Sequence, residues 1–125
     1  MSKVLKFGGK SLASLHTNNN LLNIIANYLE TSSLIIVVSA IGNTTDLLLE
    51  LLEKAKENKP YTNHLQELKT LNFYPQINTE EHFKLIENIL QGVSLIQDYS
   101  PKVQDLLLAQ GELISSKVVT QLLSN

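Results

Sequence analysis

The chain has 125 residues, of which 43% are hydrophobic and 18% are charged, so it is long enough for one compact domain and too short for two ordinary ones. Its formal charge of −2 makes nucleic acids and acidic membrane surfaces poor candidate partners. The absence of cysteine excludes disulfides, thiolate metal sites and cysteine catalysis. The N-terminal residues resemble neither a signal peptide nor a transit peptide, so we expect a cytoplasmic protein.

The first forty residues are typical of a βαβ unit. Residues 3–7 predict a short strand that ends at a Gly-Gly pair, where the backbone approaches a neighbour closely. Residues 21–29 carry the apolar stripe of an amphipathic helix. Residues 34–38 (LIIVV) form a continuous apolar run, which predicts a strand covered on both faces of a parallel sheet. The two strand ends should therefore share the sheet edge where open α/β sheets bind ligands.

The rest of the chain predicts helices. Residues 46–56 form one helix, and a weaker one lies between Pro60 and Pro75. The spacing of Asn78 and Glu81 resembles a capping box, and Ser100-Pro101 opens a last helical stretch that Gly111 interrupts. The predicted class is α/β, rich in helices with a short parallel sheet. Because a two-stranded sheet is small, we expect the chain to be the front part of a larger sheet domain.

Three segments carry candidate chemistry. Residues 6–11 (KFGGKS) place glycines, lysines and a hydroxyl at a strand end, as phosphate sites do, although Val4 stands where a Walker A motif needs glycine. Residues 39–46 (SAIGNTTD) precede a helix N-terminus, where free N–H groups favour anions. Residues 110–116 place Glu112 beside a glycine. Taken singly, the first segment is better explained as a turn with a solvated lysine and the third as a solvated glutamate beside a tolerated glycine, whereas the second is equally compatible with a capped βα turn.

No metal site is predicted from the histidines. His16, His64 and His82 are widely spaced in the sequence, and we expect them to lie on the surface. The leucine-rich stripes are interpreted as core rather than as cofactor or membrane contacts.

Taken in order, the three segments resemble the first three motifs of aspartate kinases. The family pattern is roughly KFGGTS, then VSA with G-x-T-[DN], then GE with a serine three residues on, and these motifs span this chain nearly end to end. The resemblance implies the N-terminal portion of an amino-acid-kinase α/β sandwich. It also implies phosphorylation of L-aspartate by ATP, with Mg²⁺, to 4-phospho-L-aspartate in the biosynthesis of lysine, threonine and methionine.

The resemblance assigns roles to residues on the phosphate side. Lys6 would neutralise charge on the transferring phosphoryl group and is the implied catalytic residue. The N–H groups of Gly8 and Gly9 would hold the phosphates of ATP, and Ser11 would supply a hydroxyl on the phosphate side. The sequence departs from the family at Lys10, which stands where the family has threonine.

On the substrate side, Ser39 and Thr45 correspond to family positions that hold aspartate, and Glu112 to one that binds at or near its amino group. Family segments that supply a catalytic aspartate, an arginine and the adenine-binding half have no counterpart in these residues. We therefore expect residues 1–125 to be the N-terminal part of the catalytic domain, lacking its second half, the ACT domains and any dehydrogenase domain. Alone it should be inactive, whereas the full-length protein should form homo-oligomers.

Two alternative functions stay open, and the sequence also indicates a subtype within the aspartate kinases. The first alternative is a non-catalytic helical binding module derived from the same fold. The second is a carbamate, glutamate or uridylate kinase, against which the Val-Ser-Ala loop argues. The long helical stretch between the second and third motifs resembles that of bifunctional aspartokinase–homoserine dehydrogenases.

Overall fold

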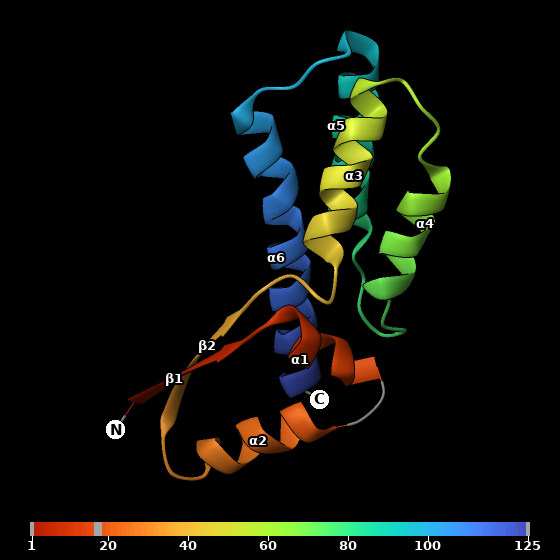
Figure 1. Cartoon of the computed structure of the whole chain (residues 1–125). Coiled ribbons are helices and arrows are strands. Elements are labelled where there is room, and N and C mark those ends of the chain that lie inside the picture. Colours follow the sequence, from red (N-terminus) through yellow and green to blue (C-terminus); the bar gives the residue numbers. More distant parts are fainter. Residues whose placement is uncertain (1, 17–18, 125) are drawn as a thin grey trace.

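The computed structural model describes residues 2–16 and 19–124, which form two strands and a set of helices (Figure 1). The elements in chain order are β1 (Ser2–Phe7), α1 (Gly9–Ala13), the 3₁₀ helix η1 (Ser14–His16), α2 (Asn20–Leu29), β2 (Ser33–Val38), α3 (Thr44–Lys56), α4 (Thr62–Leu71), α5 (Glu80–Ile96) and α6 (Pro101–Ser124). The predicted helix-rich α/β class is confirmed. The short helices α1 and η1 were not predicted, because they contain too few residues to show an apolar period.

The strands β1 and β2 pair in parallel, with Ser2 opposite Ser33 and Phe7 opposite Val38. Helix α2 provides the crossover between them and packs on β2, which confirms the predicted βαβ unit. Because the six residues of β1 pair one to one with the six residues of β2, both strands end at the same level. The loops that follow Phe7 and Val38 therefore start side by side at one edge of the sheet (Figure 1).

The prediction that β2 is covered on both faces is wrong. Burial alternates along the strand, and the exposed positions on the two strands share one face, where Val4, Ile35 and Val37 are 56%, 58% and 45% exposed. The reason is that α2 and α6 contact β2 while no described element covers the opposite face. On the covered face, Leu34 and Ile36 pack against the core.

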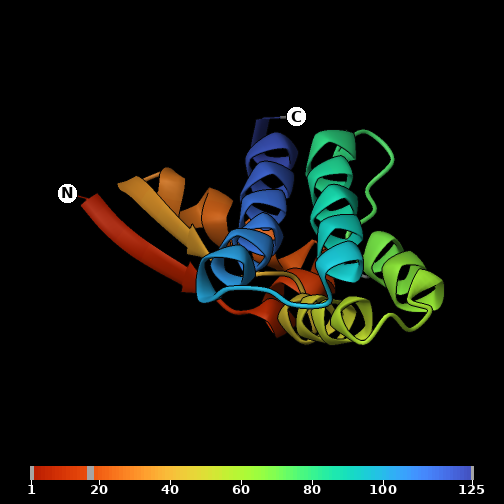
Figure 2. The same cartoon turned by 90° about the horizontal axis from the view of Figure 1, so that it is seen from above.

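The buried core cluster has most of its members on α3, α4, α5 and α6, and Leu12, Leu21 and Ile25 extend it to α1 and α2. Helix α3 lies across α4, α5 and α6 and contacts all three, while α6 also contacts β2 (Figures 1 and 2). On α3, Leu48, Leu51 and Leu52 are fully buried. The apolar stripes predicted as core are therefore confirmed as core, and α6 joins the helical part to the sheet.

The starts of the last two helices differ in how far they match the prediction. Val103 N–H donates to the hydroxyl of Ser100, which confirms the predicted start of α6. At α5, the Asn78 side chain accepts from Glu80 N–H, but Thr79 is the N-cap residue, so the proposed capping box is not formed in that register. The predicted interruption at Gly111 is also wrong, because α6 is continuous from Pro101 to Ser124.

Candidate functional site at the strand ends

The Gly-Gly turn after β1 is placed by close contact with the second loop. The N–H of Gly42 donates a 2.8 Å hydrogen bond to the carbonyl oxygen of Gly9. A Cβ atom at position 9 would lie 2.7 Å from the carbonyl oxygen of Gly42 and 2.8 Å from that of Ala40. The close backbone approach predicted at this Gly-Gly pair is thus found at Gly9, whereas a Cβ atom on Gly8 would meet no atom within 4 Å.

The loop after β2 continues the sheet for one residue and then begins a helix. Ser39 N–H donates to the carbonyl oxygen of Phe7 at 3.1 Å, so this loop remains attached to the end of β1. Gly42 has a φ of +54°, a left-handed conformation that glycine adopts without strain. The N–H groups of Thr45 and Asp46, in the first turn of α3, donate to no other described residue. They offer donors for an anionic group.

The third segment meets the second through the backbone of α6. A Cβ atom on Gly111 would lie 2.9 Å from the methyl group of Thr44 and 3.2 Å from the Cβ of Ala40. Since Gly9 also approaches Ala40, all three sequence segments converge around Ala40. Gly111 is therefore required for helix packing, which is why a glycine stands inside a helix that does not break.

The side chains named from the sequence lie around this convergence and are exposed. Ser39 is exposed in the second loop, Ser11 on α1 and Thr45 at the start of α3, and Glu112 is exposed on α6 directly after Gly111. Lys6 lies on the uncovered face of the sheet, opposite Val37. Neither Lys6 nor Glu112 forms an ion pair with another described residue. The structure thus brings the backbones together and leaves both charges available to ligands.

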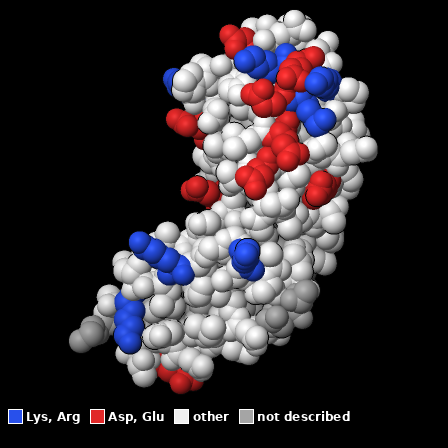
Figure 3. All heavy atoms as spheres, viewed as in Figure 1, with Lys and Arg blue, Asp and Glu red and all other residues white. Residues whose placement is uncertain are grey.

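Charge is distributed unevenly between the sheet part and the helical part. Residues 1–45 contain Lys3, Lys6 and Lys10 but only one acidic residue, Glu30, whereas the remaining residues carry more acidic than basic side chains. Figure 3 shows lysine side chains over the sheet and α1, and acidic groups mixed with further lysines over the helical part. The phosphate side of the strand-end site, with Lys6 and Lys10, therefore carries positive charge, although the whole chain is negative.

A buried polar pair behind the second loop was missed by sequence reasoning. Asn72, at the end of α4, is 1% exposed, and its side-chain NH₂ donates at 3.0 Å to the hydroxyl of Thr44, which is fully buried. Further along α6, the buried hydroxyl of Ser115 has no hydrogen-bond partner among the residues described. Because Asn72 and Thr44 are 28 residues apart, no local sequence pattern indicates their contact.

The three histidines have separate surroundings, and not all of them are simple surface residues. His82 is half-buried and its Nδ1 lies 3.0 Å from Oε1 of Gln110. His64 is half-buried beside Glu50, and exposed His16 stacks on the ring of Tyr74. Within residues 2–16 and 19–124, no three His, Cys, Asp or Glu side chains are close enough to hold a metal ion.

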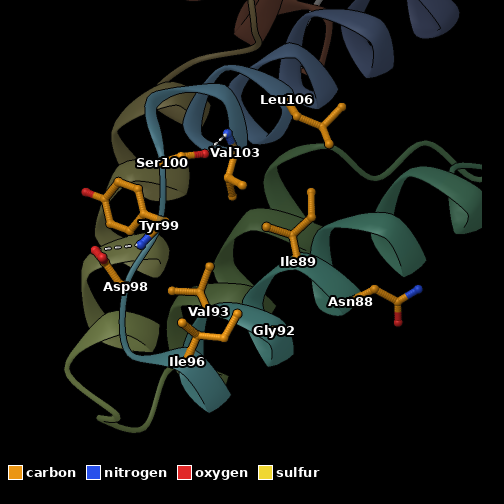
Figure 4. Close-up of a pocket in the computed structure, with 10 residues that line it drawn as sticks. All are labelled: Asn88, Ile89, Gly92, Val93, Ile96, Asp98, Tyr99, Ser100, Val103 and Leu106. Carbon is orange, nitrogen blue, oxygen red and sulfur yellow. Dashed lines mark hydrogen bonds between the residues drawn. The ribbon is translucent and has the colours of Figure 1, made fainter.

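An apolar groove lies at the far end of the helical part. It has a volume of about 490 Å³ and is formed by α5, the start of α6 and the loop between them (Figure 4). Apolar side chains such as Ile89, Ile96 and Leu106 line it, and Asp98 is its single charged residue. None of the site residues named from the sequence contributes to this groove, so it is separate from the strand-end site. No described helix combines the length and apolarity needed to span a membrane.

Comparison with known proteins decides the family. The model of the amino acid kinase family matches residues 1–125. This chain belongs to the amino acid kinase family. The resemblance to aspartate kinases is confirmed by curated relatives: the chain is 25% identical to a bifunctional aspartokinase/homoserine dehydrogenase of Buchnera aphidicola, and 29% identical to aspartokinase 1, chloroplastic, of Arabidopsis thaliana. These alignments cover 98% and 92% of this amino acid kinase chain.

The fold agrees with the same family. Escherichia coli aspartokinase III, solved in complex with lysine and aspartate in the T-state, superposes with a TM-score of 0.67 and 28% identity over 93% of this chain. The chain spans only 17% and 22% of the two curated relatives and 27% of the solved chain. It therefore corresponds to part of each of these proteins. The bifunctional subtype stays a prediction, since both kinds of relative match.

Proposed function

We propose that this chain provides the phosphate loop and the aspartate loop of an aspartate kinase, which transfers the γ-phosphoryl group of ATP to the side-chain carboxylate of L-aspartate. The observation that carries this proposal is the convergence of Gly9, Ala40 and Gly111, because it joins the three motif segments at the end of a parallel sheet. The similarity to aspartokinases over nearly the whole chain supports the same function.

On the phosphate side, a carboxylate oxygen of aspartate forms a bond to the γ-phosphorus while the bond to the bridging oxygen of ADP breaks. Lys6, exposed and without an ion pair among described residues, stabilises the negative charge on the transferring group. The N–H groups of Gly8 and Gly9 donate to phosphate oxygens, and Ser11 adds a hydroxyl. Lys10 replaces the hydroxyl of the family pattern with a second cation at this end of the site.

On the substrate side, Ser39 and Thr45 hold L-aspartate through their exposed hydroxyl groups. The N–H groups of Thr45 and Asp46 at the start of α3 favour a carboxylate, because they lack other partners among the described residues. Glu112 binds the ammonium group of the substrate. Lys6 and Glu112 form no ion pair with another described residue, which supports these roles.

Magnesium would enter with ATP. The described residues contain no cluster of three His, Cys, Asp or Glu side chains, so they do not form a dedicated metal site. Mg²⁺ in phosphoryl transfer is held largely by substrate phosphates and water with one or two carboxylates, which needs no such cluster. The residues present are compatible with ATP carrying its metal, and no step is assigned to a metal held by this chain.

The 125 residues alone should bind without turnover. The family resemblance assigns a catalytic aspartate and an arginine for the substrate to later segments, and this chain spans 17% to 27% of its relatives. Positioning the two reactants together supplies much of the rate of such reactions. The 125 residues alone therefore retain contacts to ATP and to L-aspartate but lose the alignment between the two reactants.

Ligand titrations followed by ¹H–¹⁵N NMR test this function. L-Aspartate should shift the amide signals of residues 39–46, and ATP with magnesium should shift those of residues 6–11. Lys6→Ala should weaken ATP binding by about tenfold, the effect of losing one charge-assisted contact, whereas Lys102→Ala, on the exposed start of α6, should leave it unchanged.

Three results would contradict parts of this proposal. Aspartate-dependent ADP release above background would show that the 125 residues are active by themselves. A folded chain without affinity for aspartate or ATP would favour the non-catalytic binding module instead. In that case the apolar groove would be its candidate binding surface. Equal losses of ATP affinity in the two lysine variants would remove the assigned role of Lys6.

A further inference from the structure

The side chain of Asn72 connects α4 to the loop that the proposed function assigns to aspartate. Its NH₂ group donates to the Thr44 hydroxyl and to the carbonyl oxygen of Leu68, at 3.0 Å in both cases. The backbone N–H of Asn72 also donates to Leu68, at 3.2 Å. The side chain is consequently fixed at the end of α4, and its hydrogen bond to Thr44 joins this helix end to the first residue of α3, directly after the loop.

Thr44 is held on two sides by this arrangement. Asn72 binds its hydroxyl group, and its methyl group packs where Gly111 leaves room for it. Its N–H donates to the carbonyl oxygen of Ile41 at 3.0 Å, which closes the loop before α3 begins. The next residue, Thr45, is exposed. Fixing Thr44 on the buried side therefore sets the direction in which the Thr45 hydroxyl and N–H face solvent.

Stability alone gives a poor explanation for this amide. The Oδ1 atom of Asn72 is buried and has no hydrogen-bond partner among the described residues. A buried polar atom without a partner opposes folding, and an apolar side chain at this position would avoid that cost. The benefit of Asn72 therefore lies in its NH₂ group, which holds Thr44 and, through it, the preceding loop.

We propose that Asn72 is a positioning residue that holds residues 39–45 in the conformation that binds the aspartate substrate. This inference rests on the proposed function for the substrate, but the placement of the loop can be measured without any ligand. The hydrogen bond from Gly42 N–H to Gly9 supplies the probe, because its exchange with solvent reports whether the two loops stay together.

The experiment compares four variants of the full chain by amide hydrogen exchange. Asn72→Ala and Thr44→Val both remove the hydrogen bond, Thr44→Ser keeps the hydroxyl, and Leu65→Ala creates a cavity elsewhere on α4. Asn72→Ala and Thr44→Val should each speed exchange of the Gly42 amide by about tenfold, the size of one lost hydrogen bond, relative to amides in the middle of α3. In Thr44→Ser, the Gly42 amide should exchange as slowly as in the unmodified chain.

Two further comparisons make the test decisive. The double variant Asn72→Ala/Thr44→Val should exchange no faster than either single variant, because both remove one shared contact. If Leu65→Ala accelerates Gly42 exchange relative to α3 as much as Asn72→Ala does, or if Asn72→Ala leaves that ratio unchanged, the positioning role is overturned. Thr44→Ser behaving like Thr44→Val would overturn it as well.

Aspartate titration links the loop to the substrate. The dissociation constant for L-aspartate should rise by about tenfold in Asn72→Ala and stay unchanged in Leu65→Ala, at a temperature where both variants are fully folded. Unchanged aspartate affinity in an Asn72→Ala protein with fast Gly42 exchange would overturn the link to the substrate. If the unmodified chain binds no aspartate, the proposed function fails, and Gly42 exchange still decides whether Asn72 positions the loop.

Discussion

The N–H of Gly42 donates to the carbonyl oxygen of Gly9, and through this 2.8 Å hydrogen bond the two strand-end loops form one surface. The distance between their backbones leaves no room for a side chain at position 9, since a Cβ there would meet the carbonyl oxygens of both Gly42 and Ala40. The site is thus built from direct backbone contact between two loops, with no side chain separating them.

Gly9→Ala should therefore destabilise the protein and separate the loops. The added Cβ would lie 2.7 Å from a backbone oxygen, which cannot move aside as a flexible side chain can. We expect a loss of roughly 1–3 kcal/mol in the free energy of unfolding, together with faster exchange of the Gly42 amide. Urea unfolding measures the first effect. Gly8→Ala is the matched control, because a Cβ on Gly8 meets no atom within 4 Å, and an equal loss in both variants would contradict this explanation.

Two glycines inside long helices should respond to alanine in opposite directions. On α6, a Cβ at Gly111 would approach Thr44, Ala40 and Leu48 at 2.9 to 3.3 Å, whereas on α5 a Cβ at Gly92 meets no atom within 4 Å. Gly92→Ala should stabilise the protein by about 0.5–1 kcal/mol through helix propensity. Gly111→Ala should lose roughly 1–3 kcal/mol through overpacking, despite the same propensity gain.

Thermal unfolding of both variants measures this difference, and the sign for Gly111 is the critical observation. If Gly111→Ala proves as stabilising as Gly92→Ala, the contact between α6 and the second loop is looser than the structure shows. In that case the third segment would be near the other two without being packed against them.

Sequence reasoning predicted the elements well where local patterns carry the information. The strands, the long helices and the close approach at the Gly-Gly turn all follow from short-range features such as residues 34–38. It was wrong about the second face of β2, because a run of apolar residues shows what a strand tolerates and not which helices cover it. It was wrong about Gly111 as well, since helix propensity predicts an interruption where packing requires a small residue.

The site residues likewise fall into those that sequence motifs predict and those that only tertiary packing brings to the site. The exposed candidates lie in motifs that can be read along the chain, and the structure places Ser39 in the second loop and Glu112 on α6, two of the segments that converge around Ala40. Asn72 was not predicted, because its contact with Thr44 joins residues 28 apart and depends on how α4 packs on α3. Tertiary packing therefore determines the buried support of the site, and no period or motif indicates it.

Stability should fall at alkaline pH partly because of Tyr74. Burial raises the pKa of its phenol above the ordinary value near 10, and the hydroxyl has no hydrogen-bond partner among the described residues. Below pH 10 the phenol is neutral in both the folded and unfolded chains. Above pH 10 the unfolded chain loses this proton first, so the contribution of Tyr74 to stability is lost as pH rises through its folded pKa.

Tyr74→Phe tests this contribution by comparing urea unfolding midpoints at pH 8 and pH 11. Phenylalanine can preserve the stack on His16, whose ring centroid lies 4.4 Å away, and removes the unpartnered hydroxyl. We expect no loss of stability at pH 8 and a smaller decrease between the two pH values than in the unmodified chain. An identical decrease in both proteins would assign the alkaline sensitivity to other groups, such as the lysines.

The uncovered face of the sheet makes neighbouring residues of β2 respond differently to the same substitution. Ile35 is 58% exposed on the open face, whereas Ile36 points to the covered face and packs against the core. Threonine keeps the β-branched shape that strands favour and adds a hydroxyl. Ile35→Thr should change the free energy of unfolding by less than about 0.5 kcal/mol, while Ile36→Thr should lose roughly 1–3 kcal/mol by burying a polar group.

Urea unfolding of the two variants measures these values, and light scattering adds a second comparison. Because Val4, Ile35 and Val37 form a contiguous apolar surface, Ile35→Thr should also lower self-association at high concentration. Equal losses of stability at positions 35 and 36 would mean that the outer face of β2 is covered in solution, for example by a second copy of the chain. That result would restore the two-sided burial that the apolar run of β2 first predicted.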